Sequence, residues 1–456
     1  MSNKILWGAA TSAYQIEGAA ATDGRGPSIW DTFSKTPGKV VNGETGDVAC
    51  DHYNRYPEDV AIMKEIGLQA YRFSLSWTRM FPTGDSRREQ RGFDFYNRLI
   101  DELLDANIKP LITAYHWDLP QPLQDEGGWA NRAVVNRFAD YAGAAAEAFG
   151  DRVGDWITLN EPWCTTWLGY GNGVHAPGVR DIDQAIAAAH HTALAHAEGS
   201  RAIKAVNSNL RTGVALNMTN YIIQNPEDPE VVQLGDLMDA QLNRWWIEAQ
   251  LFGKYPQVLV DEWGDKLARV IRPGDEDLLK VDSDLLGINY YSDGFLCSPD
   301  ENSKPSIDGM VFPFQQRVNG KPTGPYTDMG WPITPSGIYD LLMRIQRDYP
   351  QFEYVAITEN GAAFDYPINE NGEVDDQRRI AYLNDHIHHV LRAVEDGSQL
   401  KAYFTWSLMD NFEWAEGYGK RFGLVHVDFD TLKRTPKNSA KTYSAIISSD
   451  GALVTK

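Results

Sequence analysis

The sequence predicts an α/β protein built as one (β/α)8 barrel, and two observations carry that prediction. Short β-branched and aromatic runs alternate with longer amphipathic segments throughout the 456 residues, which is the order of parallel β-α units. No Pro/Ser-rich linker, low-complexity tract or internal repeat interrupts the alternation. We therefore expect a single TIM barrel over residues 1–456, in which extended loops after the strands form a pocket.

The predicted strands and helices follow one another in regular order. The strands span Ile5–Thr11, Gln69–Ser74, Lys109–His116, Asp155–Asn160, Arg211–Asn217, Asp284–Tyr290, Tyr354–Thr358 and Lys401–Trp406. The helical segments have apolar residues at three- and four-residue spacing, and several begin at Asp, Ser or Pro. They span Phe93–Ala106, Arg132–Phe149, Asp183–Ala205, Pro229–Leu251, Ser336–Asp348 and Asp376–Glu395.

One long segment, Cys297–Pro335, fits neither pattern. It follows the sixth predicted strand, is rich in Pro, Gly, Asn and Ser, and shows no periodicity. A loop of this length in a compact domain is typically a lid or binding wall, or else disordered. We predict a wall of the pocket, because Trp331 lies within the segment.

Composition and charge narrow the class of protein. The net charge of −21 and the pI near 4.9 disfavour nucleic acid and anionic membranes as partners. No run of apolar residues is long enough to span a membrane, and the first residues lack the apolar core of a signal peptide. The cysteines Cys50, Cys164 and Cys297 are too few and scattered for a disulfide framework or a zinc site. A cytoplasmic protein is expected, and the oligomeric state is left open.

Two glutamates stand at the ends of predicted strands. Glu161 follows Asp155–Asn160, Glu359 follows Tyr354–Thr358, and a chain breaker comes shortly after each carboxylate. A single Glu is most often solvated or part of a surface ion pair. A carboxylate at the carboxyl end of a buried barrel strand costs several kcal/mol of desolvation unless it is paired. We therefore expect a chain that has two such carboxylates to use both. The pair therefore points to glycoside hydrolysis by two carboxyl groups.

Further motifs resemble glycoside hydrolase family 1, whose members are mostly β-glucosidases and related retaining β-glycosidases. The resemblance covers nearly the whole chain, from Leu6–Gly18 through Asn160-Glu161-Pro162 and Thr358-Glu359-Asn360-Gly361 to Arg421–Leu424. It implies that Glu161 is the general acid/base and Glu359 the nucleophile. It also implies that Arg72 and Tyr291 contact the nucleophile.

A retaining mechanism places its two carboxyl groups roughly 5–5.5 Å apart. Like charges so close cannot both ionise cheaply, so one group must hold a proton near neutral pH. Since Arg72 and Tyr291 are expected beside Glu359, we expect Glu359 to be ionised and Glu161 to be the proton donor.

The resemblance also implies a shell of sugar-binding residues. Around the terminal sugar these are Gln15, His116, Trp117, Asn160, Asn289, Trp406, Glu413, Trp414 and Phe422. On the leaving-group side they are Trp163, Cys164, Trp167, Asn172, His175 and Trp331. Asn160 is suited to hold the 2-hydroxyl, and Trp406 to form a platform beneath the ring. Purely structural roles stay open for two residues of this shell, a core imidazole for His116 and a barrel plug for Trp406. A structural ion pair likewise stays open for Arg72.

Departures from two branches of the family define the expected substrate. The branch that acts on 6-phosphorylated sugars has Ser and Tyr where this chain has Glu413 and Phe422, although Lys420 is shared. A carboxylate at position 413 would repel a phosphate. The thioglucosidase branch replaces the acid/base Glu by Gln, whereas Glu161 is present here. The resemblance thus implies β-glucosides, cellobiose and short cello-oligosaccharides as substrates, with no metal and no cofactor.

Alternatives from other classes predict a different sequence. A broader β-galactosidase or β-fucosidase activity is compatible with the same shell, because axial and equatorial 4-hydroxyls can both reach Gln15 or Glu413. A catalytically silent sugar-binding barrel would be expected to lack Glu161 or Glu359, and a structural protein on this scaffold would lack the polar shell too. All of these residues are present.

Overall fold

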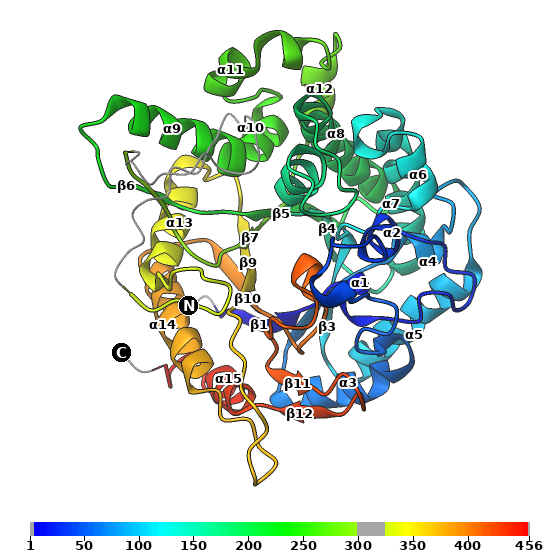
Figure 1. The fold of residues 1–456 in the computed structure, drawn as a ribbon, viewed down its shortest axis with the longest axis vertical. Helices are drawn as coiled ribbons and strands as arrows, with labels where there is room; N and C mark the ends of the chain where they lie inside the picture. The colour runs from blue at the N-terminus through cyan, green and yellow to red at the C-terminus, as the bar shows by residue number, and fades with distance from the viewer. Residues whose placement is uncertain (1–3, 299–323, 455–456) are drawn as a thin grey trace.

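The strands close into a parallel barrel at the centre of the molecule. The computed structural model describes residues 4–298 and 324–454. The barrel order is β1-β10-β9-β7-β5-β4-β3-β2, and every neighbouring pair is parallel (Figure 1). The strands are β1 (Leu6–Ala10), β2 (Ala70–Ser74), β3 (Lys109–Tyr115), β4 (Asp155–Asn160), β5 (Arg211–Asn217), β7 (Leu285–Asn289), β9 (Tyr354–Asn360) and β10 (Leu400–Trp406). The predicted (β/α)8 barrel is confirmed.

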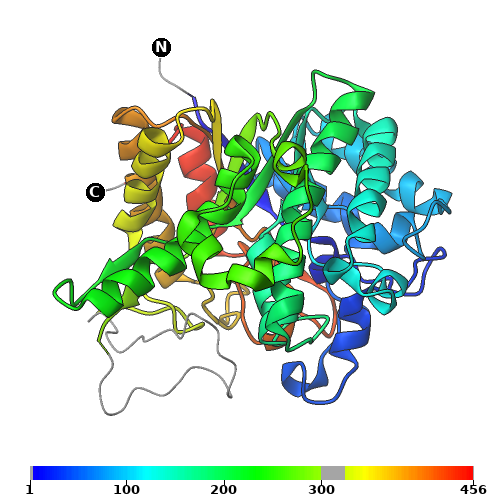
Figure 2. The ribbon, with the colours of Figure 1, turned by 90° about the horizontal axis from the view of Figure 1, so that it is seen from above.

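Helices surround this barrel on all sides (Figures 1 and 2). The longer ones are α3 (His52–Ile66), α5 (Gln90–Asp105), α7 (Ala133–Phe149), α8 (Ile182–Val206), α13 (Pro335–Asp348), α14 (Gln377–Glu395) and α15 (Asn438–Ser448). After β5 the chain forms α9 (Pro229–Asp239), a π-helical turn η4 (Ala240–Arg244), α10 (Trp245–Phe252), α11 (Gln257–Ala268) and α12 (Asp275–Leu279). No helix in the described part of the chain is long and apolar enough to cross a bilayer.

Short elements occupy the loops. Helical turns are α1 (Ala13–Ile16), α2 (Ile29–Ser34), η1 (Val41–Gly43), α4 (Trp77–Met80), α6 (Gln121–Asp125), η2 (Gly128–Ala130), η3 (Cys164–Gly171) and η5 (Trp414–Glu416). Two small sheets pair β6 (Tyr221–Ile223) with β8 (Gly294–Leu296) and β11 (Val425–Val427) with β12 (Arg434–Pro436).

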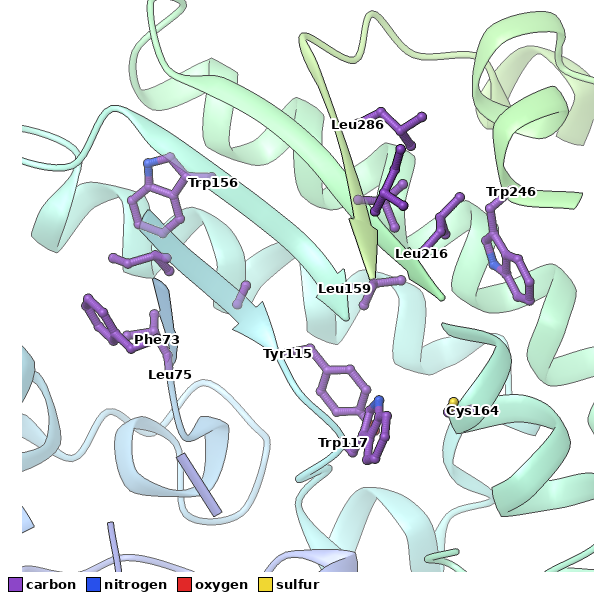
Figure 3. Packing of buried hydrophobic residues seen from close by; sticks show 14 of the residues in the cluster. Phe73, Leu75, Tyr115, Trp117, Trp156, Leu159, Cys164, Leu216, Trp246 and Leu286 are labelled. Carbon is purple, nitrogen blue, oxygen red and sulfur yellow. The ribbon is translucent and has the colours of Figure 1, made fainter. Parts of the chain in front are cut away.

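Side-chain alternation along the strands divides the core into two layers. On β2, Tyr71 and Phe73 belong to the large cluster between the strands and the helices, whereas Ala70 belongs to the small cluster inside the barrel. Figure 3 shows part of the outer layer, which includes Phe73 of β2 and Trp156 of β4. The inner cluster is rich in alanine, so it leaves room for polar side chains toward the carboxyl ends of the strands.

Each predicted strand and helix overlaps an observed element, with ends that differ by up to three residues, whereas α3, α11, α12, α15 and the two small sheets were not among the predicted segments. Glu359 lies within β9, which runs two residues past the predicted end. The predicted helix Pro229–Leu251 is divided by the η4 turn. Within the predicted wall Cys297–Pro335, residues 299–323 lie outside the described residues, whereas Trp331 lines the central cavity.

Candidate active site

The two predicted carboxylates face one cavity at the carboxyl ends of the strands. The cavity has a volume of about 570 Å³, and both Glu161 and Glu359 line it. Other expected residues in its lining are His116, Trp117, Trp163, Cys164, His175, Asn289, Tyr291, Trp331, Trp406, Glu413, Trp414 and Phe422. This is the size and the mixed apolar and polar lining that a small-molecule site requires.

Backbone irregularities aim several of these side chains into the cavity. The pairing register shifts between Ile157 and Asn160 on β4 and between Ile288 and Asn289 on β7, next to each carboxylate. Glu161 has a positive φ of 42°, and Trp117 and Trp414 have φ values of 80° and 52°. Such backbone costs about 1–3 kcal/mol per residue and clusters where function requires it. The core packing of the barrel must therefore offset strain at this end.

The Glu359 carboxylate is held by a cation and a phenol. Arg72 Nη1 donates to Glu359 Oε1 at 2.7 Å, and Tyr291 OH donates to Glu359 Oε2 at 2.6 Å. Arg72 is itself fixed on β2, because its Nε donates to Thr113 Oγ1 at 3.0 Å. Burial is the largest cause and raises the pKa of Glu359 above its ordinary value, while Arg72, Tyr291 and Asn289 oppose that rise. The ionised form of Glu359 thus has a full positive charge in direct contact.

The hydrogen-bond partners of the Glu161 carboxyl within the described part of the chain are neutral. Asn289 Nδ2 donates to Glu161 Oε1 at 2.7 Å, and the Cys164 thiol donates to Oε2 at 3.1 Å. Burial and the charge of Glu359 raise the pKa of Glu161 to about 7. Glu161 is therefore the carboxyl of this pair that retains a proton near neutral pH.

A network of amides connects the two carboxyl groups. Asn160 Oδ1 accepts from Arg72 Nη2 at 2.6 Å and from Asn289 Nδ2 at 3.0 Å. Thr358 Oγ1 donates to Asn289 Oδ1 at 2.6 Å, which fixes the orientation of that amide. Asn289, expected only as a sugar ligand, therefore also positions Glu161. Nothing in the sequence motifs indicated the contribution of Thr358 or of Thr113.

Gln15 and Glu413 form a polar corner of the site. Ser12 Oγ donates to Gln15 Oε1 at 2.6 Å, while Gln15 Nε2 contacts Asn411 Oδ1 at 3.0 Å and Glu413 Oε2 at 3.5 Å. Desolvation and then the charges of Glu359 and Glu161 raise the pKa of Glu413 to about 8. Gln15 is buried behind the cavity lining, so Glu413 is the member of this corner that faces the cavity.

His116 stands between the amide network and the aromatic wall. Its Nε2 lies 3.0 Å from Asn160 Nδ2, and its ring stacks on Trp406 with a centroid distance of 5.8 Å. Burial and the Arg72 charge hold the pKa of His116 well below its usual range, so the imidazole is neutral. Its buried Nδ1 has no hydrogen-bond partner among the described residues. His116 lines the cavity, and a neutral imidazole there is suited to bind a sugar hydroxyl.

The outer part of the cavity is aromatic. Trp331 lies 5.3 Å from Tyr291 and 6.2 Å from Phe422, measured between ring centroids. The expected leaving-group residues Trp163, Cys164 and His175 also line the cavity.

Two expected leaving-group residues lie elsewhere. Trp167 is fully buried and packs on Trp263 at 5.4 Å, and Asn172 is also buried away from the cavity lining. Trp167 lies within the π-helical turn η3 and Asn172 directly follows it, and neither side chain reaches the cavity lining.

An apolar wall was missed by the sequence reasoning. Leu168, Val174, Met218, Tyr221, Met238, Leu242 and Phe295 complete the cavity. These residues come from loops and short elements without a catalytic motif, so only the position of the loops after strands four to six could have indicated them. Among the described residues, no group of three or more His, Cys, Asp or Glu side chains is arranged to hold a metal ion.

Comparisons with known proteins agree with this geometry. The family profile for glycosyl hydrolase family 1 matches residues 1–452. The chain is 44% identical to beta-glucosidase A of Acetivibrio thermocellus and 47% identical to a 1,4-beta-D-glucan glucohydrolase of Thermotoga neapolitana, each over 98% of both chains. A solved beta-glucosidase from Thermotoga maritima in complex with deoxynojirimycin superposes with a TM-score of 0.90 at 42% identity, over 98% of both chains. The chain belongs to glycosyl hydrolase family 1.

Proposed function

We propose that this chain is a retaining β-glucosidase in which Glu359 is the nucleophile and Glu161 the acid/base. The observation that carries the division of roles is the direct contact of Arg72 with Glu359, 2.7 Å between Nη1 and Oε1, while Glu161 has only the amide and thiol partners. A nucleophile must be ionised and a general acid must hold a proton. The unequal surroundings of the two carboxyl groups supply both conditions at one pH.

The first step joins the sugar to Glu359. Its carboxylate attacks the anomeric carbon, the glycosidic C–O bond breaks, and the proton of Glu161 passes to the leaving oxygen. We propose that Asn160, whose side-chain oxygen accepts hydrogen bonds from Arg72 and Asn289, binds the sugar 2-hydroxyl as positive charge develops on the ring. The product of this step is a covalent glucosyl ester of Glu359.

The second step returns the enzyme to its starting state. The Glu161 carboxylate takes a proton from water, the water oxygen attacks the anomeric carbon, and the ester bond to Glu359 breaks. Because esterification removes the Glu359 charge, one of the causes that raises the pKa of Glu161 is absent in the intermediate. Glu161 thereby holds its proton before the first step and is ionised, and so available as a base, in the second.

The pH dependence of kcat/KM tests this assignment. Glu161 must be protonated in the free enzyme, so activity toward cellobiose should fall as pH rises through about 7, approaching tenfold per pH unit. Protonation of Glu359 should produce the acid limb at lower pH. A kcat/KM profile that stays flat from pH 6 to pH 9 would contradict the role of Glu161. As a control, a pH-jump back to pH 6 should restore full activity and exclude unfolding.

The substrates proposed are O-linked β-D-glucosides, including cellobiose and short cello-oligosaccharides. Aromatic side chains such as Trp163 and Trp331 in the outer cavity suit stacking on a second sugar or an aryl group. Lys420, the cation shared with the 6-phosphate branch, donates its Nζ proton to the Asp328 carbonyl at 2.7 Å. Glu413 and Phe422 line the cavity, whereas Lys420 is not among its lining residues, and a carboxyl group at position 413 disfavours a phosphate.

A substrate panel measures that specificity. We expect kcat/KM to be highest for an aryl β-glucoside, lower for the matching β-galactoside and β-fucoside, and roughly 10- to 1,000-fold lower for the 6-phospho-β-glucoside. Cellobiose should be hydrolysed to glucose. Preference for the phosphorylated sugar would overturn the substrate assignment, and comparable rates on glucoside and fucoside would favour the broader β-glycosidase.

We further propose that residues 1–456 form a single catalytic domain that acts in the cytoplasm. The barrel strands draw on both ends of the described chain, with β1 paired to β10. Cys50, Cys164 and Cys297 are all buried and form no disulfide, which suits a reducing compartment.

A further inference from the structure

The thiol of Cys164 lies against the carboxyl proposed as acid/base. Its Sγ is 3.1 Å from Glu161 Oε2, and both side chains are buried. The backbone fixes this contact, because Cys164 N donates to the Glu161 carbonyl at 2.9 Å where the turn η3 begins. This backbone hydrogen bond joins the two residues, so it fixes the position of the thiol relative to the Glu161 carboxyl.

The remaining contacts assign the two oxygens of Glu161 different roles. Oε1 accepts the Asn289 amide proton at 2.7 Å. An oxygen that accepts this bond is the poorer site for the acid proton, so the proton of neutral Glu161 resides on Oε2. Oε2 is the oxygen that Cys164 contacts.

The thiol itself stays protonated. Burial, followed by the adjacent charge of Glu161, raises the pKa of Cys164 well above its usual range. A neutral S–H is a weak donor and sulfur a weak acceptor, so the group can adapt to either protonation state of Oε2 without a proton transfer of its own.

We propose that Cys164 is a positioning residue for Glu161, donating its S–H to Oε2 when the carboxyl is ionised and so setting the pH at which the acid form is lost. The inference rests on the acid/base role proposed for Glu161. When Oε2 carries the proton, the sulfur accepts a hydrogen bond from Oε2–H. When substrate is bound, the leaving oxygen replaces the sulfur as the acceptor of that hydrogen bond. When the proton has gone to the leaving group, the S–H turns to the carboxylate and stabilises it. A strong donor there would make Glu161 ionise too early, whereas an S–H leaves its acidity near neutrality.

Substitutions at position 164 give a graded test. Cys164→Val has similar size and no donor. The alkaline limb, which is the fall of kcat/KM on cellobiose as pH rises, should therefore move to higher pH by about 0.5 unit. At a pH above the limb, this shift corresponds to a roughly threefold larger fraction of enzyme with Glu161 protonated. Cys164→Ser keeps a donor, and a stronger one than the thiol, so it should not raise the limb as Cys164→Val does but should leave it in place or move it to lower pH. Cys297→Val changes another buried cysteine, outside the cavity lining, and should not move the limb.

Glu161→Gln, measured beside these variants, separates the two proposals. If the alkaline limb survives in Glu161→Gln, the acid/base role and the thiol inference both fall. If Glu161→Gln abolishes the limb while Cys164→Val leaves it unmoved, or Val and Ser move it equally, only the thiol inference is overturned.

An infrared measurement on the wild-type enzyme covers the case in which Cys164→Val does not fold. The S–H stretching band that disappears in Cys164→Ser should shift to lower wavenumber as pH rises, with the midpoint of the alkaline limb. A band that stays fixed through that pH range would overturn the inference.

Discussion

Glu359→Gln should lower kcat for β-glucosides by roughly four orders of magnitude or more, because an amide cannot serve as the nucleophile that forms the covalent intermediate. The amide is nearly isosteric with the carboxylate. Its oxygen can accept from Arg72 and its NH2 group can donate to the Tyr291 hydroxyl, so the fold should persist. The loss should be measured by steady-state kinetics on an aryl β-glucoside. Glu353→Gln, on the exposed approach to the same strand, is the matched control and should retain wild-type activity.

Azide extends this test to the position of the missing group. Glu359→Ala leaves space on the face of the sugar opposite the leaving group, and azide bound there should displace an activated leaving group to give the α-glucosyl azide. Formation of the β-product, or no rescue at any azide concentration, would argue against Glu359 as nucleophile.

Glu161→Ala should separate substrates by their leaving groups. Cellobiose needs proton donation, so its kcat/KM should fall by roughly 10²- to 10⁴-fold. A 2,4-dinitrophenyl glucoside leaves without a proton, so its kcat/KM should change little, while its kcat falls because no base activates water. Stopped-flow measurement should show a burst of the phenol followed by slow turnover.

The control and the contradicting result for Glu161 are equally direct. Glu262→Ala, an exposed position on α11, should leave both substrates unaffected. Azide added to Glu161→Ala should attack the glucosyl ester and give the β-glucosyl azide. Equal losses on cellobiose and the activated glucoside would mean that Glu161 does not act as the acid.

The barrel and its two carboxylates are accessible to sequence reasoning for a physical reason. A buried parallel strand is a short apolar run, and a carboxylate directly after such a run is costly unless it is used. Asp155–Asn160 before Glu161 and Tyr354–Thr358 before Glu359 both have this form, and the structure places both at the same end of the barrel.

Contacts between strands explain what the sequence could not supply. The ion pair of Arg72 with Glu359 joins residues 287 positions apart, and it came from the family resemblance and not from any local pattern. The hydroxyl of Thr113 on Arg72 has no motif at all. The family resemblance also placed Trp167 on the leaving-group side of the cavity. In the structure Trp167 lies in the π-helical turn η3, and its indole packs on Trp263.

The electrostatics of the site sharpen the expected division between the carboxyl groups. Burial raises the pKa of both Glu161 and Glu359, so location at a strand end alone does not distinguish them. The hydrogen bonds do distinguish them. Of the two carboxyl groups, Arg72 and Tyr291 donate to Glu359, whereas Glu161 accepts from the Asn289 amide and the Cys164 thiol. Predicting that difference requires knowing which side chains meet at the centre of the barrel.

Trapping the intermediate tests the central claim most directly. The enzyme should be incubated with 2,4-dinitrophenyl 2-deoxy-2-fluoro-β-glucoside. Its fluorine slows both steps, while its activated leaving group keeps formation of the ester faster than hydrolysis, so the ester accumulates. Peptide mapping by mass spectrometry should then find one fluoroglucosyl group, on the peptide that contains Tyr354–Asn360 and at Glu359 within it. A label on any other residue, or inactivation without a covalent label, would contradict the account.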